Sequence, residues 1–421
     1  MYNEKISYKL IGILFLTFMV GFLYCFIILP NIQNNFNIEL DGEQYNIIAQ
    51  NIYQGKGFFF DKGQEPIISD ARYTLGRPPL YPYFLVLIYL IFGQKIWIVQ
   101  LIQIVISTVT GYVIYKIANK IFEERVALFS AIVYGIHPLF FWYPPRLYTE
   151  TILIFLLAII VYYTILLFEN LSLKHSIMLG ILLGIFNLVK SSMLLFPLYI
   201  VVGLLCFYTY QKRQVIKSFL VINILMALII SPWTLRNYIV SDHFVPVQIG
   251  IGLQFFRGNS IVFNNKAGLL KSSFNEPLAT SLQEEQIILN QLRINTKQGK
   301  EYDIFNVFDE MMLEWLVNNP KKFLKKIVKG SLFFWYLGST EFKTKLILIT
   351  QLLILIPSIV GMYFSLKDNK KVLPLMLVIL YFLLIHAPLV AVGRYAVPIM
   401  PYMIIFAAYG CLNSFKKLIK S

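Results

Sequence analysis

The chain has 421 residues, of which 57% are hydrophobic and only 14% are charged, and its formal net charge at pH 7 is +15. Soluble domains are about half apolar and about a quarter charged, so this composition excludes an ordinary soluble protein and indicates an integral membrane protein. The positive charge does not indicate a nucleic-acid partner. The lysines gather in short loops between apolar segments, as they do on the cytoplasmic side of membrane proteins.

Ten apolar segments reach or approach the ~20 residues that a bilayer-spanning helix needs. They are residues 8–29, 96–118, 126–142, 148–168, 176–190, 191–209, 218–233, 344–366, 371–388 and 394–415. The first is too long for the core of a signal peptide and lacks a small-residue cleavage pattern, so we expect it to be retained as the first helix. Two further apolar segments, 79–93 and 323–338, are short or interrupted by lysines. We interpret both as interfacial or re-entrant helices on the outer side.

Loop charges predict the topology. Six groups of basic residues fall on one side of the membrane if ten segments cross it: Lys5 and Lys9; Lys116, Lys120 and Arg125; Lys174; Lys212, Arg213 and Lys217; Lys367, Lys370 and Lys371; and Lys416, Lys417 and Lys420. Loops rich in Lys and Arg stay in the cytoplasm. The sequence therefore predicts a multi-pass protein of the plasma (inner) membrane with both termini in the cytoplasm.

The outer loops divide this all-α polytopic chain into three parts. Residues 1–240 should form a transmembrane module that carries a first outer loop over 30–95. Residues 241–343 should form a larger outer region, helical from about 281 to 338, where two glutamates open an apolar-periodic stretch. Residues 344–421 should supply the C-terminal transmembrane helices.

Three acidic residues lie where helices are predicted to begin on the outer side. Asp41 and Glu43 open a helix in the first outer loop, and Glu150 opens the apolar segment 148–168. Acids in a first turn often serve only to cap a helix and complement its dipole. The alternative is a catalytic role as general base, which needs a carboxylate held within reach of a reacting hydroxyl. A carboxylate facing lipid is costly, so Glu150 should face an aqueous cavity.

Four cations, Arg77, Lys190, Arg236 and Arg394, lie where apolar segments reach the outer face. A single cation there can be an anchor to bulk lipid headgroups. Several on the outer face run against the positive-inside trend, and they favour a phosphate site, because Arg binds phosphate through charge-assisted and often bidentate hydrogen bonds. Tyr395, next to Arg394, belongs to this predicted phosphate-binding group.

Six stretches in this order resemble the family 39-like glycosyltransferases of the GT-C fold, which include the protein O-mannosyltransferases and the lipid A aminoarabinose transferase. The stretches are DGEQYNIIAQNIYQGKGF, GRPPLYPYFLVLIYLIFG, LYTETILIF, SPWTLRNY, GIGLQFFRGN and RYAVPIMP. The resemblance implies a GT-C-type bundle of about ten to twelve spans. It also implies inverting transfer of a hexosyl or pentosyl group from a polyprenyl-phosphate donor to a hydroxyl of a lipid, glycan or protein on the outer face.

The resemblance assigns particular residues. Asp41 matches the family's first-loop acid, Arg77 the basic residue before the Pro-Pro pair, and Glu150 the acid that opens a later outer helix; Arg236 and Arg394 match basic positions at the outer edge. Many relatives have adjacent Asp-Glu where this chain has Asp41-Gly42-Glu43, so Asp41 and Glu43 both remain candidates for the base. Gly76 stands where the lipid A enzyme has an acid, so the donor sugar is not specified.

No cofactor is expected, and no residue pattern indicates a divalent metal; Cys25, Cys206 and Cys411 are scattered through apolar segments and form neither a disulfide framework nor a metal site. Two other functions stay open. A transporter or flippase of lipid-linked sugars would show symmetric halves and helices broken in mid-membrane. An O-antigen polymerase or ligase would also use outward arginines, without a first-loop Asp.

The topology can be tested by cysteine labelling at Gln94 and Lys343, in a background without the native cysteines. If segments 79–93 and 323–338 do not cross, a membrane-impermeant reagent added to intact cells should label both positions, because all basic loops then lie inside. A cysteine at Lys174, in a predicted inner loop, should stay unlabelled. Labelling of position 94 or 343 from the cytoplasmic side alone would rule out the ten-span model.

Overall fold

The computed structural model describes residues 7–32, 40–60, 74–208, 210–263, 301–338, 340–368 and 370–420, and all regular structure in these ranges is helical. Together with the six apolar spans described below, this confirms the predicted all-α polytopic class. The helices of the first half are α1 (Tyr8–Leu23), η1 (Tyr24–Ile28), α2 (Leu29–Ile32), α3 (Leu40–Tyr53), α4 (Leu80–Phe92), α5 (Ile96–Ile121), α6 (Glu124–Ile136), α7 (Pro138–Trp142), α8 (Glu150–Glu169), α9 (Leu173–Val189), η2 (Ser191–Met193) and α10 (Phe196–Phe207).

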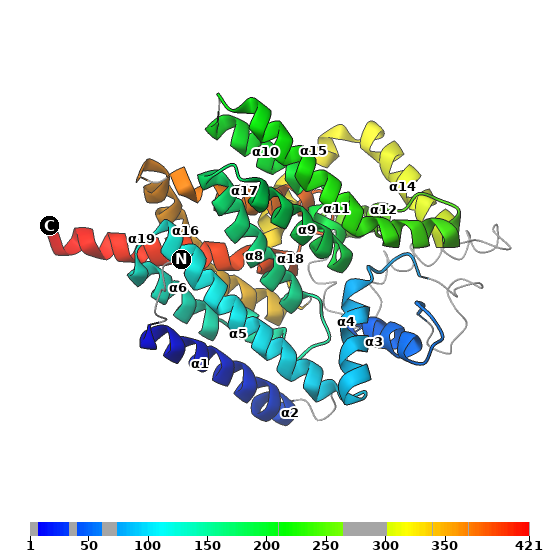
Figure 1. Cartoon of the computed structure of the whole chain (residues 1–421), viewed down its shortest axis with the longest axis horizontal. Coiled ribbons are helices and arrows are strands. Elements are labelled where there is room, and N and C mark those ends of the chain that lie inside the picture. The colour runs from blue at the N-terminus through cyan, green and yellow to red at the C-terminus, as the bar shows by residue number, and fades with distance from the viewer. Residues whose placement is uncertain are drawn as a thin grey trace.

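The second half of the described chain continues from Lys212 with both long and short helices. Its elements are α11 (Lys212–Ser241), α12 (Ile251–Phe263), α14 (Glu301–Asn318), α15 (Pro320–Tyr336), α16 (Glu341–Asp368), η4 (Lys370–Val372), α17 (Leu373–His386), α18 (Gly393–Ala396), η5 (Val397–Ile399) and α19 (Met400–Lys420). Helices α3, α4, α12 and α14 lie at one end of the molecule, and the C-terminal end of α19 lies at the other (Figure 1). The predicted helical stretch before residue 301 falls outside the described residues.

Six helical segments of the described chain are long and apolar enough to cross a membrane: Tyr8–Asn31, Ile96–Ile121, Glu150–Glu169, Lys212–Ser241, Glu341–Leu366 and Gly393–Ser414. Each overlaps one of the ten predicted spans. The other four predicted spans correspond to α6, α9, α10 and α17, which have 13, 17, 12 and 14 residues. Segment 126–142 is split at His137, because the residue before a proline is disfavoured in the helical region. That these four cross the bilayer stays a prediction.

Helix α8 links two charged clusters. It has 20 residues, which corresponds to ~30 Å and so to the thickness of the hydrocarbon core. At its C-terminal end, Glu169 pairs with Lys120 at 2.7 Å and with Lys371 at 3.5 Å. These two lysines belong to groups that the loop charges place on the same side of the membrane, and the structure does place them together. Glu150, at the other end of α8, lies among the predicted outer residues.

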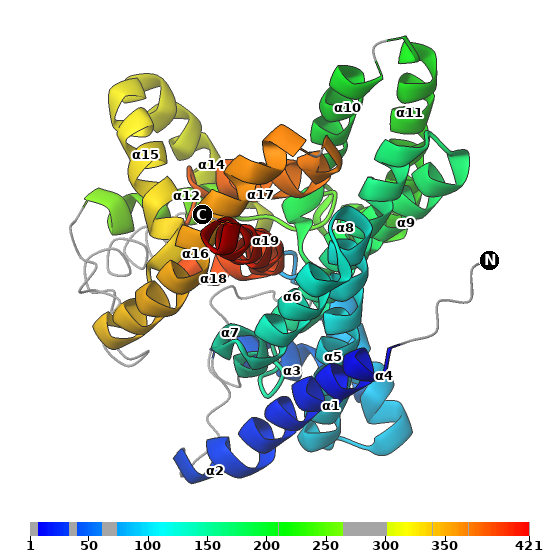
Figure 2. The same cartoon turned by 90° about the vertical axis from the view of Figure 1, so that its left-hand side faces the viewer.

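Glycines let the backbones of neighbouring helices come into direct contact. A Cβ added to Gly361 of α16 would lie 1.8 Å from the carbonyl oxygen of Phe406 in α19, and one at Gly410 would lie 2.4 Å from that of Pro357. A Cβ at Gly184 of α9 would lie 2.6 Å from Ile229 of α11. Small residues that let helix backbones approach are typical of membrane helix interfaces. Helices α9 to α11 form one flank of the bundle and α15 and α16 the other, with α8 and α19 between them (Figure 2).

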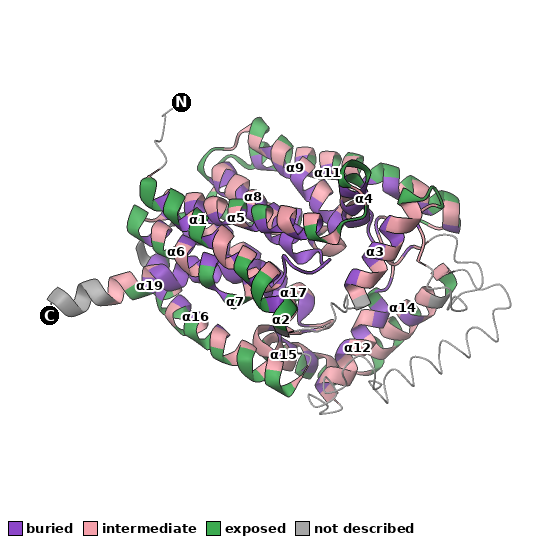
Figure 3. Ribbon diagram, turned by 90° about the horizontal axis from the view of Figure 1, so that it is seen from below, coloured by how far each residue is buried: buried purple, intermediate pink, exposed green. Residues whose placement is uncertain are grey.

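The outward sides of the long helices are apolar and exposed. Along α11, Ile216, Leu220, Ile224 and Leu228 follow one another at four-residue spacing and are all exposed. Figure 3 shows such exposed residues on the outward sides of α11, α1 and α16, with buried residues turned toward the centre. A helix that is apolar on all sides suits a membrane span, where lipid covers the outward stripe.

Replacing Gly361 with alanine should weaken the contact between α16 and α19. The new methyl group would overlap the Phe406 carbonyl and force the helices apart, at a cost of about 1–3 kcal/mol. Thermal unfolding of the purified protein in detergent should then begin at a lower temperature. Gly12→Ala is the matched control, since a Cβ there meets no atom within 4 Å; it should be neutral or slightly stabilising. Equal behaviour of the two variants would contradict this account of the packing.

Candidate active site

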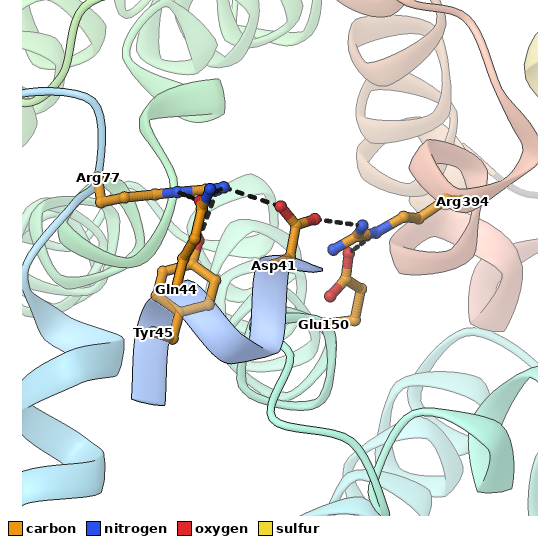
Figure 4. Close-up of polar contacts among 6 residues, drawn as sticks. All are labelled: Asp41, Gln44, Tyr45, Arg77, Glu150 and Arg394. Carbon is orange, nitrogen blue, oxygen red and sulfur yellow. Dashed lines mark hydrogen bonds and ion pairs between the residues drawn. The ribbon is translucent and has the colours of Figure 1, made fainter. Parts of the chain in front are cut away.

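Asp41 binds two arginines from distant parts of the chain. Its carboxylate lies in the first turn of α3 and is about one-third exposed. One oxygen, Oδ1, is 2.8 Å from Nη2 of Arg77, and the other, Oδ2, is 2.6 Å from Nη1 of Arg394. These arginines are 36 and 353 residues away in the sequence. The two guanidinium groups approach Asp41 from opposite sides (Figure 4).

Glu150 extends this cluster on the Arg394 side. Its side chain is only 2% exposed, and its Oε1 accepts a hydrogen bond from Nε of Arg394. The other oxygen, Oε2, has no hydrogen-bond partner among the described residues. The ring of Tyr148 lies 4.4 Å from the guanidinium carbon of Arg394. Arg77, Asp41, Arg394 and Glu150 thus form a row of alternating charge, and such pairing is what a low-dielectric site requires of its ions.

Two residues of α3 hold Arg77 together with Asp41. Gln44 accepts hydrogen bonds from Nε of Arg77, at 3.0 Å, and from Nη2, and the hydroxyl of Tyr45 lies 3.5 Å from Nη1. Residues three and four positions along a helix share a face, so Gln44 and Tyr45 stand beside Asp41. Neither residue was among the candidates predicted from the sequence, although their spacing from Asp41 was the available signal. Pro78 then stiffens the chain after Arg77.

Lys190 and Tyr395 lie beside this cluster. The ammonium nitrogen of Lys190 is 4.3 Å from the ring centroid of Tyr395, within the range of a cation–π contact. Tyr395 follows Arg394 in α18 and stacks on His386, with ring centroids 4.9 Å apart. The structure therefore brings Lys190 next to the segment that carries Arg394, and the predicted role of Lys190 and Tyr395 in phosphate binding stays a prediction.

Arg236 holds backbone groups of the loop before α4, and Glu43 lies on a different face of α3 from Asp41. Arg236 donates to the carbonyl oxygens of Thr74, at 3.0 Å, and Phe58, at 3.3 Å, and its guanidinium carbon lies 4.5 Å from the Trp233 ring centroid. Its present contacts hold the first outer loop, and its predicted role in phosphate binding stays a prediction. Glu43 is two residues from Asp41, about 200° around α3, so the two side chains leave different faces of the helix.

The two arginines determine the charge state of Asp41. Burial alone would raise the pKa of this carboxyl group, but Arg394 and Arg77 lower it by charge and by hydrogen bonding, and they lower it further than burial raises it. The pKa of Asp41 is therefore well below its usual range, so the group is ionised at neutral pH and is a weak base while both arginines hold it.

No group of three or more His, Cys, Asp or Glu side chains placed to hold a metal ion occurs within the described ranges. The residues that gather here are cations and carboxylates. This set can bind an anion through Arg77 and Arg394, and it can accept a proton at a carboxylate.

The comparisons with known proteins agree with the resemblance stated above. Residues 76–235 match the family model of the dolichyl-phosphate-mannose-protein mannosyltransferases. This range contains Arg77, Glu150 and Lys190. No curated protein matches the chain.

Solved structures show the fold of this chain. The oligosaccharyltransferase AglB of Archaeoglobus fulgidus in its apo form has a TM-score of 0.61 and 14% identity, over 99% of this chain and 51% of AglB. Its complex with an inhibitory peptide and a dolichol-phosphate has a TM-score of 0.59 and 15% identity, over 98% of this chain and 51% of AglB. The chain thus spans about half the length of AglB. ArnT from Cupriavidus metallidurans is less similar. Its TM-score is 0.45 and its identity is 11%, over 97% of this chain and 79% of ArnT. The likeness to the two AglB structures confirms the GT-C-type fold.

The ion pairs of Asp41 should persist in mild acid. The pKa of Asp41 is lower in the folded protein than in the unfolded chain, where it is about 3.9, so the unfolded chain takes up this proton first as the pH falls. The stability that Asp41 contributes should therefore be constant from about pH 8 to about pH 5 and decrease below about pH 4. The measurement is the difference in thermal unfolding midpoint between the wild type and Asp41→Asn across this range. A decrease already between pH 7 and pH 5 would show that the arginines do not hold the carboxylate as described.

Proposed function

We propose that this protein is a membrane glycosyltransferase that moves a sugar from a polyprenyl-phosphate donor to an acceptor hydroxyl at the outer face of the membrane. The observation that carries the proposal is the carboxylate of Asp41 held between Arg77 and Arg394, at one end of a helix of bilayer length. The match to a mannosyltransferase family model supports the reaction class. The dolichol-phosphate in the AglB complex supports a lipid phosphate as the donor's leaving group.

The chemistry needs one base and a group of cations. The acceptor oxygen attacks the anomeric carbon, the bond from that carbon to the phosphate oxygen breaks, and the electron pair leaves with polyprenyl phosphate. A phosphate leaving group is a weak base, so it needs charge stabilisation rather than a general acid, and Arg77 and Arg394 supply that charge. The hydroxyl proton passes to a carboxylate, for which Asp41 is placed. A single displacement of this kind inverts the anomeric centre.

Donor binding and base activation are linked, because the same arginines serve both. Without donor, both oxygens of Asp41 are occupied by guanidinium groups, and its pKa is held low. A donor phosphate that accepts hydrogen bonds from Arg77 and Arg394 competes with Asp41 for them. The pKa of Asp41 then rises, and at least one of its oxygens becomes free to accept a proton. The order that follows is donor first and proton transfer second.

The neighbouring residues have supporting roles in this scheme. Glu150 holds Arg394 through Nε, which leaves the Nη groups of Arg394 directed toward Asp41 or a phosphate. Lys190 lies over the Tyr395 ring, and it would add positive charge beside the phosphate. The protein acts as a multi-pass enzyme of the plasma (inner) membrane, surrounded by membrane lipids, with both termini in the cytoplasm. The acceptor is a lipid, glycan or protein that carries a hydroxyl group.

Replacing Asp41 with asparagine should reduce transfer by about 10²–10⁴-fold, the usual contribution of a general base. Binding of polyprenyl phosphate should be retained or strengthened, because the arginines lose a competing anion. The acceptor can be identified by mass spectrometry of envelope glycans and lipids from a strain that lacks the protein. Turnover and donor affinity can then be measured with the purified variant.

Glu43→Gln is the matched control for this experiment, since it removes an acid from the same turn of α3 and leaves Asp41 in place. It should retain near-normal turnover. If Asp41→Asn turns over normally and Glu43→Gln does not, Glu43 is the base. If both variants are active, Glu150 is the next residue to replace, and the role proposed for Asp41 is wrong.

A further inference from the structure

The segment Thr74–Arg77 has no helical or extended structure of its own, yet it carries one of the two arginines that bind Asp41. It is held by residues far along the chain. The carboxylate of Glu301 accepts a hydrogen bond from the backbone N–H of Leu75, at 2.7 Å, and from the hydroxyl of Thr74, at 3.3 Å. Glu301 is the first residue of α14, 226 residues beyond Leu75.

Two further contacts hold the same peptide groups from the other side. Arg236, near the end of α11, donates to the carbonyl oxygen of Thr74 at 3.0 Å. The backbone N–H of Ile249 donates to the carbonyl oxygen of Leu75 at 3.3 Å. Leu75 is therefore fixed at both its N–H and its C=O. The chain reaches Arg77 two residues later and then a pair of prolines, which allow little further adjustment of the backbone.

Helix α14 is itself packed tightly into the outer region. Asp309 of α14 accepts a hydrogen bond of 2.6 Å from the N–H of Gly252 in α12, and a Cβ at Gly252 would lie 2.3 Å from the carbonyl oxygen of Phe308. The start of α14 therefore cannot move independently of α12. Helices α12 and α14 lie at the same end of the molecule as α3 and α4 (Figure 1).

The same group of helices contacts the loop that precedes Arg394. A Cβ at Gly258 of α12 would lie 1.9 Å from the carbonyl oxygen of Leu389, and one at Gly330 of α15 would lie 2.2 Å from that of Ala387. The buried Lys326 of α15 donates to the carbonyl oxygen of Phe255 in α12 at 2.7 Å, which joins these two helices. The outer helices thus touch both arginine-bearing segments, and Glu301 is their contact on the Arg77 side.

We infer that Glu301 is a positioning residue, which holds the Thr74–Leu75 backbone so that Arg77 can bind the donor phosphate. The inference rests on the proposed function in one respect, namely that the ligand of Arg77 is a phosphate. It adds that the outer region between α11 and α16 sets the geometry of the donor site, 226 residues away in sequence. Movement of α14 would therefore be felt at Arg77.

The test compares Glu301→Gln with Asp303→Asn. Both substitutions remove an acid from the first turn of α14, so both lose the same kind of interaction with the helix dipole. Asp303 is exposed, and Glu301 contacts the Thr74–Leu75 segment. Two quantities are measured for full-length protein in nanodiscs: hydrogen–deuterium exchange of the peptide that contains residues 74–77, and affinity for undecaprenyl phosphate.

Glu301→Gln should speed exchange in this peptide and weaken phosphate binding by about tenfold, because the neutral amide keeps only one acceptor oxygen and replaces charge-assisted hydrogen bonds with weaker ones. Asp303→Asn should change neither quantity. Glu301→Gln should also add little to Arg77→Lys in the double variant, because two residues that act through one interaction are not additive. Full additivity, or faster exchange with unchanged binding, would overturn the inference and leave Glu301 a purely structural role.

The exchange measurement separates this inference from the proposed function. If the wild type does not bind undecaprenyl phosphate, the proposed donor is wrong, and the role of Glu301 toward a phosphate falls with it. If the wild type binds but Glu301→Gln leaves both exchange and binding as in the wild type, the proposed function stands, and the positioning role of Glu301 is overturned.

Discussion

The carboxylate of Asp41, shared between the guanidinium groups of Arg77 and Arg394, joins three separate segments of the chain. Asp41 lies in α3, Arg77 in the irregular loop before α4, and Arg394 in α18, near the start of the last helical segment. Charges at the edge of an apolar bundle are costly unless they are paired. The ion pairs therefore constrain where α3 and α18 lie relative to each other. A second carboxylate, Glu150, fixes the orientation of Arg394 within this arrangement.

The same pairing sets the chemical character of the site before any ligand binds. A carboxylate that is held by two arginines stays ionised and is a weak base. An arginine that is paired with a carboxylate can exchange that anion for another one. In the proposed reaction, the donor's phosphodiester carries one negative charge, as Asp41 does, and its charge and its number of acceptor oxygens increase as the sugar leaves. Recognition of the donor and release of the base are then two results of one exchange of partners.

Most of the charged residues of this site could be selected from the sequence, because a charge at the end of an apolar segment is conspicuous. Asp41, Arg77, Glu150 and Arg394 were all selected on that basis. Their pairing could not be predicted, since it joins residues up to 353 positions apart. For the same reason nothing singled out Glu301, which looks like an ordinary first-turn acid of a helix. Arg236 was also selected from its position at the end of a span; its guanidinium holds the backbone carbonyls of Thr74 and Phe58, which the sequence did not indicate, and its role toward phosphate stays a prediction.

The fold was predictable to a similar degree. Apolar length identified the six long helices, and it overestimated the continuity of segment 126–142, where Pro138 starts a new short helix. The short helices α9, α10 and α17 were expected as spans from composition, and their lengths of 17, 12 and 14 residues depend on tertiary packing that a hydropathy pattern does not encode. Loop charges placed Lys120 and Lys371 on one side, and Glu169 does join them.

The close approach of α16 and α19 has a consequence for motion. With Gly361 and Gly410 at their contact, the two backbones interlock without intervening side chains, so sliding or tilting one helix against the other would bring carbonyl oxygens into collision. Arg394 lies just before α19, on the segment that this pair supports. The backbone that leads from Arg394 into α19 therefore ends in a helix that cannot easily slide against α16. Arg394 should therefore keep its position when the ion pairs of Asp41 exchange for those of a ligand, with Glu150 as its second support.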